Sequence, residues 1–321
     1  MSLPDLLQTG PMRAIVEETI KDAFTIHRLW EMEDKDAFLA EHGGKIKAVA
    51  TGGHIRVDSA LMQRLPNLKI VSNFGVGYDS VDAAWAGEHG IIVTNTPDVL
   101  TEEVADITLA LLLMAARELG AAERHLRDGK WPSGDYPLTT TTLRGRSVGI
   151  LGLGRIGKAV ATRVEAFGLP VSYFGRTRQE GVSYPYYDSP VALAEAVDTL
   201  IIVLPGTAAT RHLVNADVLK ALGPDGIVVN IGRGPVIDEQ ALVKALQDGT
   251  IRSVGLDVFE HEPQVPAELI AMDRVVLLPH VGSASNHTRN QMGKLVADNL
   301  VAFAEGKPPL TPVAETPFKG W

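Results

Sequence analysis

The sequence predicts an α/β protein with two parallel β-sheets, each covered by helices. Two observations carry this prediction. Short apolar segments alternate with helical patterns along the chain, and a glycine-rich turn stands in the middle of the chain rather than near its start. Alternation of strand and helix is typical of parallel sheets. The 321 residues suffice for two domains, each with a substantial core.

The composition narrows the classes of function. Apolar residues make up 45% and charged residues 21% of the chain, as in soluble globular proteins. A net charge of −9 without a basic stripe argues against nucleic acid as a partner. Because there is no cysteine, disulfides, thiol catalysis and cysteine-ligated zinc are excluded, and no metal site is predicted. We expect a cytoplasmic protein: the start lacks a secretory pattern, and the most apolar segment, 104–116, is too short to span a membrane.

The glycine-rich turn predicts a dinucleotide site. The apolar segment Val148–Leu151 leads into a Gly-x-Gly-x-x-Gly pattern, and a helical pattern follows from Lys158. The first glycine permits a tight turn, the second lets the backbone approach a pyrophosphate, and the third lets helix and strand pack closely. The helix N-terminus then offers N–H groups to the phosphates. The expected cofactor contacts are Gly152, Leu153, Gly154, Arg155, Ile156 and Gly157.

The end of the next strand predicts which dinucleotide binds. Sites for NAD usually carry Asp or Glu at this position, where the acid bonds the ribose 2′-hydroxyl. Here Phe174 is followed by Gly175, Arg176, Thr177 and Arg178, and no acid comes before Glu180. Guanidinium groups suit a 2′-phosphate, so the sequence predicts NADP(H) as the cofactor. The alternative is two solvated arginines in a loop.

The first part of the chain predicts a second, smaller parallel sheet. Strands are expected at Ile46–Thr51, Leu68–Phe74 and Ile91–Thr96, with less certain ones near Leu6 and Thr25. Pro97 ends the last of these strands. Thr101 is a plausible N-cap for a buried helix that runs to about Asp128.

Six strands are expected from Ser147 onward, the number in a full doubly wound Rossmann domain. They are Val148–Leu151, Val171–Phe174, Thr199–Leu204, Gly226–Ile231, Ser253–Asp257 and Val275–Leu278. A last helix, about Thr288–Glu305, should return to the first sheet. The prediction is therefore a Rossmann dinucleotide domain, 99–286, inserted in a flavodoxin-like substrate domain, 1–98 plus 287–321, with the substrate in the cleft between them.

Three polar residues follow the ends of neighbouring strands in the second sheet. Arg233, Glu262 and His280 should meet at one edge, because ligands of parallel sheets bind beyond the carboxyl ends of the strands. A guanidinium could bind a carboxylate, and an imidazole oriented by a carboxylate could transfer a proton. We therefore expect Arg233 to anchor a 2-keto acid, His280 to act as acid/base and Glu262 to support it. Taken singly, each residue also has an ordinary structural explanation.

Four motifs, in this order and spacing, resemble those of the D-2-hydroxyacid dehydrogenase family over nearly the whole chain. They are Val148–Gly157, Ile231–Glu239, Leu256–Pro263 and Leu278–Gly282. Within the family, the arginines after Gly175 most resemble those of NADPH-dependent glyoxylate/hydroxypyruvate reductases. The resemblance implies an oxidoreductase that passes a hydride from NADPH to a small 2-keto acid, and a homodimer.

The resemblance also implies further contacts. Val76 and Gly77 match a loop whose N–H groups hold the substrate carboxylate, and Gly53 would lie beside the substrate, as would Arg233 and His280. Asp257 matches an aspartate that bonds the nicotinamide carboxamide. The other cofactor contacts implied are Thr101, Leu204, Pro205, Thr210, Ile231, Gly232 and Gly282.

Several alternatives stay open at this stage. A broad-specificity 2-keto acid reductase or another D-2-hydroxyacid dehydrogenase would use the same residues. A corepressor that senses a dinucleotide could retain Arg233, Glu262 and His280 without catalysis. Trp131 is either a loop anchor or a contact with the active site of a partner subunit, and His54 is more readily a surface histidine than a substrate contact.

Overall fold

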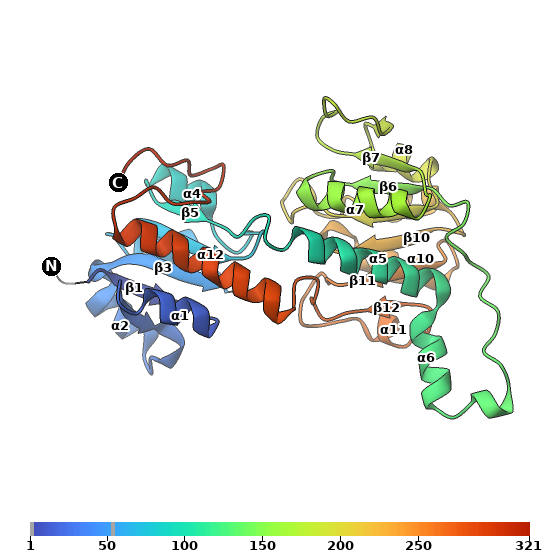
Figure 1. Cartoon of the computed structure of the whole chain (residues 1–321), viewed down its shortest axis with the longest axis horizontal. Helices are drawn as coiled ribbons and strands as arrows, with labels where there is room; N and C mark the ends of the chain where they lie inside the picture. The colour runs from blue at the N-terminus through green and yellow to red at the C-terminus, as the bar shows by residue number, and fades with distance from the viewer. Residues whose placement is uncertain (1–2, 53–54) are drawn as a thin grey trace. The chain divides into compact units, whose positions relative to one another are not determined.

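The computed structural model describes residues 3–52 and 55–321 and divides into two compact units. The first unit comprises Met1–Leu100 and Ser285–Trp321, and the second comprises Thr101–Ala284. The second is thus inserted in the sequence of the first, with borders two residues from those expected. In Figure 1 each unit is a sheet with helices on its faces. The predicted fold class, α/β with two parallel sheets, is confirmed.

The sheet of the first unit has five parallel strands in the order β2-β1-β3-β4-β5. This is the flavodoxin-like order, so the two less certain strands near Leu6 and Thr25 belong to the sheet. The strands are β1 (Asp5–Gln8), β2 (Thr25–Arg28), β3 (Ile46–Gly52), β4 (Ile70–Phe74) and β5 (Ile92–Thr94).

Helices cover both faces of this sheet. Successive strand residues point to opposite faces, so Leu6 and Leu7 lie in two different cores. One core includes residues of α1 (Ala14–Ile20) and α12 (Asn286–Ala304), so the C-terminal helix returns to the first unit. The other core includes residues of α2 (Lys35–His42), α3 (Ser59–Gln63) and α4 (Ala83–Glu88).

The sheet of the second unit has seven parallel strands in the order β12-β11-β10-β9-β6-β7-β8. The order reverses between β6 and β9, which is where doubly wound sheets bind ligands. The strands are β6 (Val148–Leu151), β7 (Val171–Phe174), β8 (Tyr186–Tyr187), β9 (Thr199–Ile202), β10 (Ile227–Asn230), β11 (Ser253–Leu256) and β12 (Val276–Leu277). Six were predicted; β8 was missed, because two residues are too short to carry a periodic pattern.

The helices of the second unit also lie on both faces. Residues of α8 (Pro190–Glu195), α9 (Ala216–Leu222) and α10 (Glu239–Gln247) form a core on one face. On the other face α5 (Thr101–Arg117) packs on β10 and β11 and beside α7 (Arg155–Ala166). A short helix, α11 (Ala267–Ile270), precedes β12. No helix in the described residues has both the length and the apolar character needed to cross a membrane.

The predicted continuous helix from Thr101 to about Asp128 is wrong. The chain breaks at Glu118, which has a left-handed backbone (φ 52°), and α6 (Leu119–Arg127) begins after it. Glu118 also accepts a hydrogen bond from Tyr136 Oη at 3.0 Å. No residue of α6 is buried, and Figure 1 shows α6 and the loop after it extending away from the sheet. Thr101 is the first residue of α5 rather than the cap before it.

Arg146 holds the starts of three neighbouring strands together. Its side chain is buried, with a relative exposure of 8%, just before β6. Nε donates to Thr199 Oγ1 at 3.1 Å, and Nη2 donates to the carbonyls of Asp198 and Asp225. These partners lie at or before the starts of β9 and β10. Burial lowers the pKa of the Arg146 guanidinium, although the charges of the nearby carboxylates Asp198 and Asp225 oppose this shift.

Arg146→Met should therefore lower the free energy of unfolding of the second unit by about 3 kcal/mol, because buried carbonyls would lose a charged donor. Arg144→Met is the matched control, since Arg144 is exposed on the same loop. Urea unfolding of both variants checks this. Equal stability of the two variants would contradict the role of Arg146.

Candidate functional site

His280 and Glu262 form a close pair in the second unit. The distance from His280 Nδ1 to Glu262 Oε2 is 2.8 Å, and Glu262 Oε1 accepts the Phe259 N–H at 3.0 Å. The glutamate side chain is 15% exposed and the histidine side chain 36%. The carboxylate is thus oriented by the backbone and in turn orients the imidazole. With Nδ1 committed to Glu262, Nε2 is the nitrogen that can exchange a proton with a ligand.

The turn that carries His280 is held by Asp257. This aspartate follows β11 and is 1% exposed. Its Oδ1 accepts the Val281 N–H at 2.7 Å, and its Oδ2 accepts the Gly282 N–H at 2.8 Å. Burial raises the pKa of the Asp257 carboxyl, although these two hydrogen bonds oppose the shift. His280 itself has a left-handed backbone (φ 54°), a conformation that Asp257 helps to hold by accepting the His280 N–H through its carbonyl.

Arg233 follows β10 in a turn whose backbone lies close to that of a neighbouring turn. Asn230 braces this turn from both sides: Nδ2 donates to the Arg233 carbonyl at 3.0 Å, and Oδ1 accepts the Gly232 N–H at 3.0 Å. A Cβ on Gly234 would lie 1.9 Å from the carbonyl carbon of Phe259. The Arg233 turn therefore packs directly on the turn after β11, which carries Glu262. Ile231 and Gly232 lie in the same connection, and a Cβ on Gly232 would crowd the Leu204 carbonyl at 2.6 Å.

The glycine-rich turn has the predicted conformation and packing. Gly152 has a positive φ of 100°, and Gly154 is the N-cap of α7, the helix that begins with Arg155 and Ile156. A Cβ on Gly157 would lie 2.2 Å from the Gly152 carbonyl oxygen, whereas no atom lies within 4 Å of a Cβ on Gly154. This open backbone at a helix N-terminus fits a bound pyrophosphate. The turn is the cradle that a dinucleotide requires.

The Gly175–Arg178 segment lies beside that cradle because Gln179 ties it there. Gln179 Nε2 donates to the Leu153 carbonyl at 2.8 Å, and its backbone N–H donates to the buried Tyr173 hydroxyl at 2.8 Å. Arg176, Thr177 and Arg178 are exposed. Sequence reasoning missed Gln179, although an amide side chain directly after the arginines was a usable signal.

The segment after β9 forms a compact turn. Thr210 Oγ1 donates to the Pro205 carbonyl at 2.6 Å and accepts the Thr207 N–H at 2.9 Å. Leu204, Pro205 and Thr210 thus share a single turn at the carboxyl end of the sheet. The structure brings together at this edge the residues predicted there from β6, β9, β10 and β11, while Thr101 lies at the start of α5.

The substrate loop predicted in the first unit is pinned through its carbonyls. Asn73 Nδ2 donates to the Gly75 and Gly77 carbonyls at 3.3 and 3.0 Å, and Asn95 Nδ2 donates to the Val76 carbonyl at 2.8 Å. Within the part of the chain that the structure describes, neither the Val76 nor the Gly77 N–H donates a hydrogen bond. These N–H groups are suited to an anionic ligand. Gly53 and His54 lie outside the described residues.

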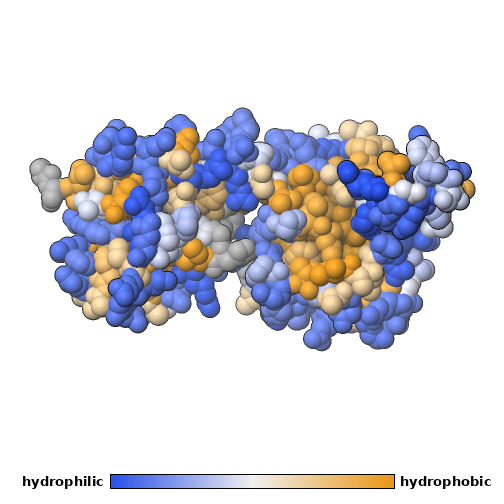
Figure 2. Space-filling view, turned by 90° about the horizontal axis from the view of Figure 1, so that it is seen from below, coloured by the Kyte–Doolittle hydropathy of each residue, from blue (hydrophilic) through white to orange (hydrophobic). Residues whose placement is uncertain are grey.

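Trp131 lies at the tip of the segment that extends from the second unit. It begins a short 3₁₀ turn, Trp131–Ser133, and the residue is 60% exposed. Its Nε1 donates to Asp135 Oδ1 at 3.3 Å. Leu119, Leu126 and Leu138 are also exposed along this segment. Figure 2 shows apolar side chains gathered on one face of the second unit, at the right of the view.

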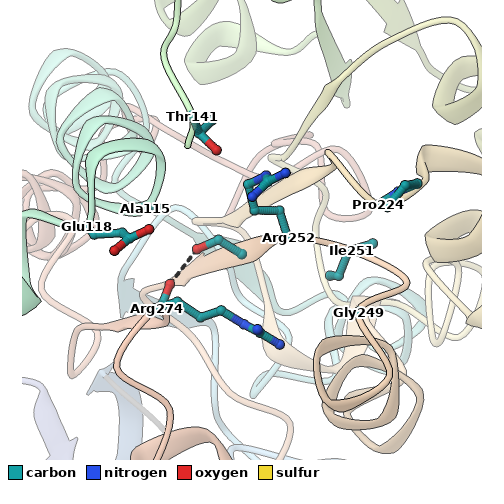
Figure 3. Close-up of a pocket in the computed structure, with 9 residues that line it drawn as sticks. Ala115, Glu118, Thr141, Pro224, Gly249, Ile251, Arg252 and Arg274 are labelled. Carbon is teal, nitrogen blue, oxygen red and sulfur yellow. Dashed lines mark hydrogen bonds between the residues drawn. The ribbon is translucent and has the colours of Figure 1, made fainter. Parts of the chain in front are cut away.

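A pocket of about 340 Å³ lies elsewhere in the second unit (Figure 3). Glu118, Thr141, Arg252 and Arg274 are among its lining residues, and Ser253 Oγ donates to the Arg274 carbonyl beside it. Because Ser253 begins β11, this pocket is at the amino ends of the strands, opposite the predicted site. Among the described residues, no group of three or more histidines and carboxylates could hold a metal ion.

Comparison with known proteins decides the family. The profile of the D-isomer specific 2-hydroxyacid dehydrogenase NAD binding domain matches residues 109–282. The chain belongs to this family. It is 47% identical to glyoxylate/hydroxypyruvate reductase A of Arabidopsis thaliana over 96% of this chain and 98% of that protein. Hydroxyphenylpyruvate reductase of Plectranthus scutellarioides is 46% identical over the same shares of the two chains.

A solved structure is also similar over its whole length. The NADPH-dependent glyoxylate/hydroxypyruvate reductase of Sinorhizobium meliloti, crystallised with NADP and malonate, has a TM-score of 0.93 and 52% identity. The match covers 99% of this chain and 98% of that chain. The resemblance found in the four sequence motifs is confirmed.

The glycine turn yields a matched pair of variants. Gly157→Ala should destabilise the second unit by about 2 kcal/mol through overpacking and lower its melting temperature by about 4–8 °C. Gly154→Ala should leave the melting temperature nearly unchanged but weaken dinucleotide binding at least about tenfold, because its methyl would stand where the pyrophosphate approaches. Calorimetry and dinucleotide titration check both. Wild-type affinity in Gly154→Ala would place the pyrophosphate elsewhere.

Proposed function

We propose that this protein reduces glyoxylate or hydroxypyruvate, or a similarly small 2-keto acid, to the 2-hydroxy acid with NADPH. The observation that carries the proposal is the His280–Glu262 pair, which stands in the same unit as Arg233 and a dinucleotide cradle. The names of two relatives support the substrate class: both the Arabidopsis protein and the Sinorhizobium protein are glyoxylate/hydroxypyruvate reductases.

The proposed cofactor is NADP(H), held along the carboxyl edge of the second sheet. Gly152–Gly157 would bind the pyrophosphate, and Arg176 and Arg178 would bind the 2′-phosphate, since no carboxylate competes at Gly175. Asp257 already accepts two backbone N–H groups, but each carboxylate oxygen has a second lone pair, so it can also accept from the nicotinamide carboxamide. The cofactor, when bound, supplies the hydride to the keto carbon.

The proposed roles of the side chains follow from their chemistry. The Arg233 guanidinium binds the substrate carboxylate, and its second nitrogen polarises the keto group. His280, protonated, gives the proton on Nε2 to the oxygen as it becomes an alkoxide. Glu262 holds the ring in place, so that Nε2 is the nitrogen that faces the substrate. Hydride and proton together convert the keto acid to the 2-hydroxy acid.

Two alternative functions would use the same site. Hydroxyphenylpyruvate reductase, at 46% identity, favours broad acceptance of 2-keto acids, and a 2-ketogluconate reductase of Gluconobacter oxydans is 38% identical. The same residues would serve any of these D-2-hydroxyacid dehydrogenases. A corepressor that binds the dinucleotide without turnover is the second alternative. Rates with a panel of 2-keto acids separate these possibilities.

We also propose that the protein is a cytoplasmic homodimer formed through the second unit. The support for the dimer is the apolar face in Figure 2 together with Leu119, Leu126 and Trp131, which are 46%, 55% and 60% exposed. Exposed apolar surface of this kind is typical of a protein–protein interface. The lack of cysteine is compatible with a reducing compartment.

His280→Ala should lower kcat for hydroxypyruvate by at least about 100-fold, because the proton donor is lost, while NADPH still binds. His261→Ala is the control, since His261 is an exposed histidine of the same turn as Glu262. Steady-state rates and NADPH fluorescence titration measure both effects. Near-normal turnover of His280→Ala would remove this residue from the proposed chemistry.

Arg176→Asp should lower the ratio of kcat/KM for NADPH to that for NADH by at least about tenfold, because a carboxylate would repel the 2′-phosphate. Arg144→Asp, an exposed change of equal charge in the same unit, should leave this ratio unchanged. An unaltered ratio in Arg176→Asp would mean that the two arginines are solvated and do not select the cofactor.

Leu126→Glu combined with Leu119→Glu should weaken the dimer, because buried carboxylates at an apolar interface are costly. Sedimentation should then give a mass near 34.4 kDa for the variant and about twice this mass for the wild type. A wild-type chain that sediments as a monomer at micromolar concentration would contradict the dimer.

A further inference from the structure

A second His–Glu pair includes Glu260, a residue of the same turn as Glu262. His212 Nε2 is 2.7 Å from Glu260 Oε1, and the same oxygen accepts from Arg211 Nη2 at 2.8 Å. The Glu260 side chain is only 8% exposed. His212 and His280 both have left-handed backbones, with φ of 51° and 54°. Each histidine thus has a strained backbone and bonds a glutamate, and the two glutamates belong to the same short turn.

His212 links two turns that matter for the proposed chemistry. Its backbone N–H donates to the Pro235 carbonyl at 2.8 Å, directly after Arg233 and Gly234. Its ring bonds Glu260, which stands two residues before Glu262. The chain between these points is already in contact, because Gly234 packs on the Phe259 carbonyl. One histidine therefore joins the Arg233 turn to the Glu262 turn.

The charges around Glu260 fix this turn further. Burial alone would raise the pKa of the Glu260 carboxyl, but the His212 hydrogen bond and the Arg211 charge outweigh burial and lower it. The Glu260 N–H also donates to Glu239 Oε2 at 3.2 Å, at the start of α10. Burial raises the pKa of the Glu239 carboxyl. Glu260 thus remains an anion held by two basic side chains.

We propose that His212 and Glu260 are a positioning pair for the reaction. They hold the turn after β11 against the turn after β10. Glu262 is thereby kept in position to support His280, and Arg233 is kept in a fixed position relative to both residues. Neither residue exchanges a proton with the substrate. This inference rests on the proposed function and extends it by two residues to which the sequence analysis assigned no role.

The test compares His212→Asn with His212→Gln. A glutamine amide can place its nitrogen near the position of Nε2 and keep the bond to Glu260, whereas the shorter asparagine cannot. Asparagine, however, is the better residue for a left-handed backbone. If only the backbone conformation of His212 matters, His212→Asn should keep more activity than His212→Gln. If the contact of the ring with Glu260 matters, His212→Gln should keep more activity. The two variants separate these explanations even if both are less stable than the wild type.

Two readouts are needed, one of them independent of turnover. We expect kcat for hydroxypyruvate to fall by about tenfold or more in His212→Asn, because a charged hydrogen bond is lost. It should stay within about threefold of the wild type in His212→Gln. The downfield proton resonance of the His280–Glu262 hydrogen bond, assigned by its loss in Glu262→Ala, should weaken in His212→Asn alone. Melting temperatures of both variants serve as the control for folding.

The outcomes are distinct. Equal kcat and an equal proton signal in the two variants, or losses that simply follow the melting temperatures, would overturn the positioning role. A wild-type protein that reduces no 2-keto acid would contradict the proposed function instead. In that case the proton signal still decides whether His212 holds Glu262 in place, because an unchanged signal in His212→Asn overturns the structural link itself.

Discussion

The site depends on one hydrogen bond, from His280 Nδ1 to Glu262. Without it the imidazole could rotate, and its orientation toward a ligand would not be fixed. The bond needs two turns from different strands to meet within 2.8 Å. Neighbouring hydrogen bonds hold both partners in place. Asp257 holds the turn that carries His280, and the Phe259 N–H donates to Glu262 Oε1.

Close backbone approach is what lets these turns meet. Gly234 contacts the Phe259 carbonyl, Gly232 contacts the Leu204 carbonyl, and Gly157 contacts the Gly152 carbonyl at distances that leave no space for a side chain. A parallel sheet brings the carboxyl ends of its strands to one edge, but it leaves the connections several ångströms apart. The glycines close this gap, so the same residue type builds both the dinucleotide cradle and the proton-transfer pair.

The sequence was sufficient for the fold class, the family and the strand ends that carry Arg233, Glu262 and His280, because these depend on periodicity and on motifs of fixed spacing. It was insufficient where tertiary contacts decide. The left-handed backbone of Glu118 could not be predicted from its residue type, and the apolar pattern around it continues across the break. Strand β8 has two residues and exists only through pairing with β7. The contact of His212 with Glu260 joins residues 48 positions apart, so no spacing rule could find it.

The proposed activity is the reduction of a small 2-keto acid by NADPH. The most direct measurement is the initial rate of NADPH oxidation with hydroxypyruvate, beside NADH under identical conditions. We expect fast turnover with a clear preference for NADPH. A preference for NADH would contradict the role of the two arginines and leave the His280–Glu262 chemistry standing. No turnover with either cofactor, for hydroxypyruvate or any other small 2-keto acid, would contradict the proposed function.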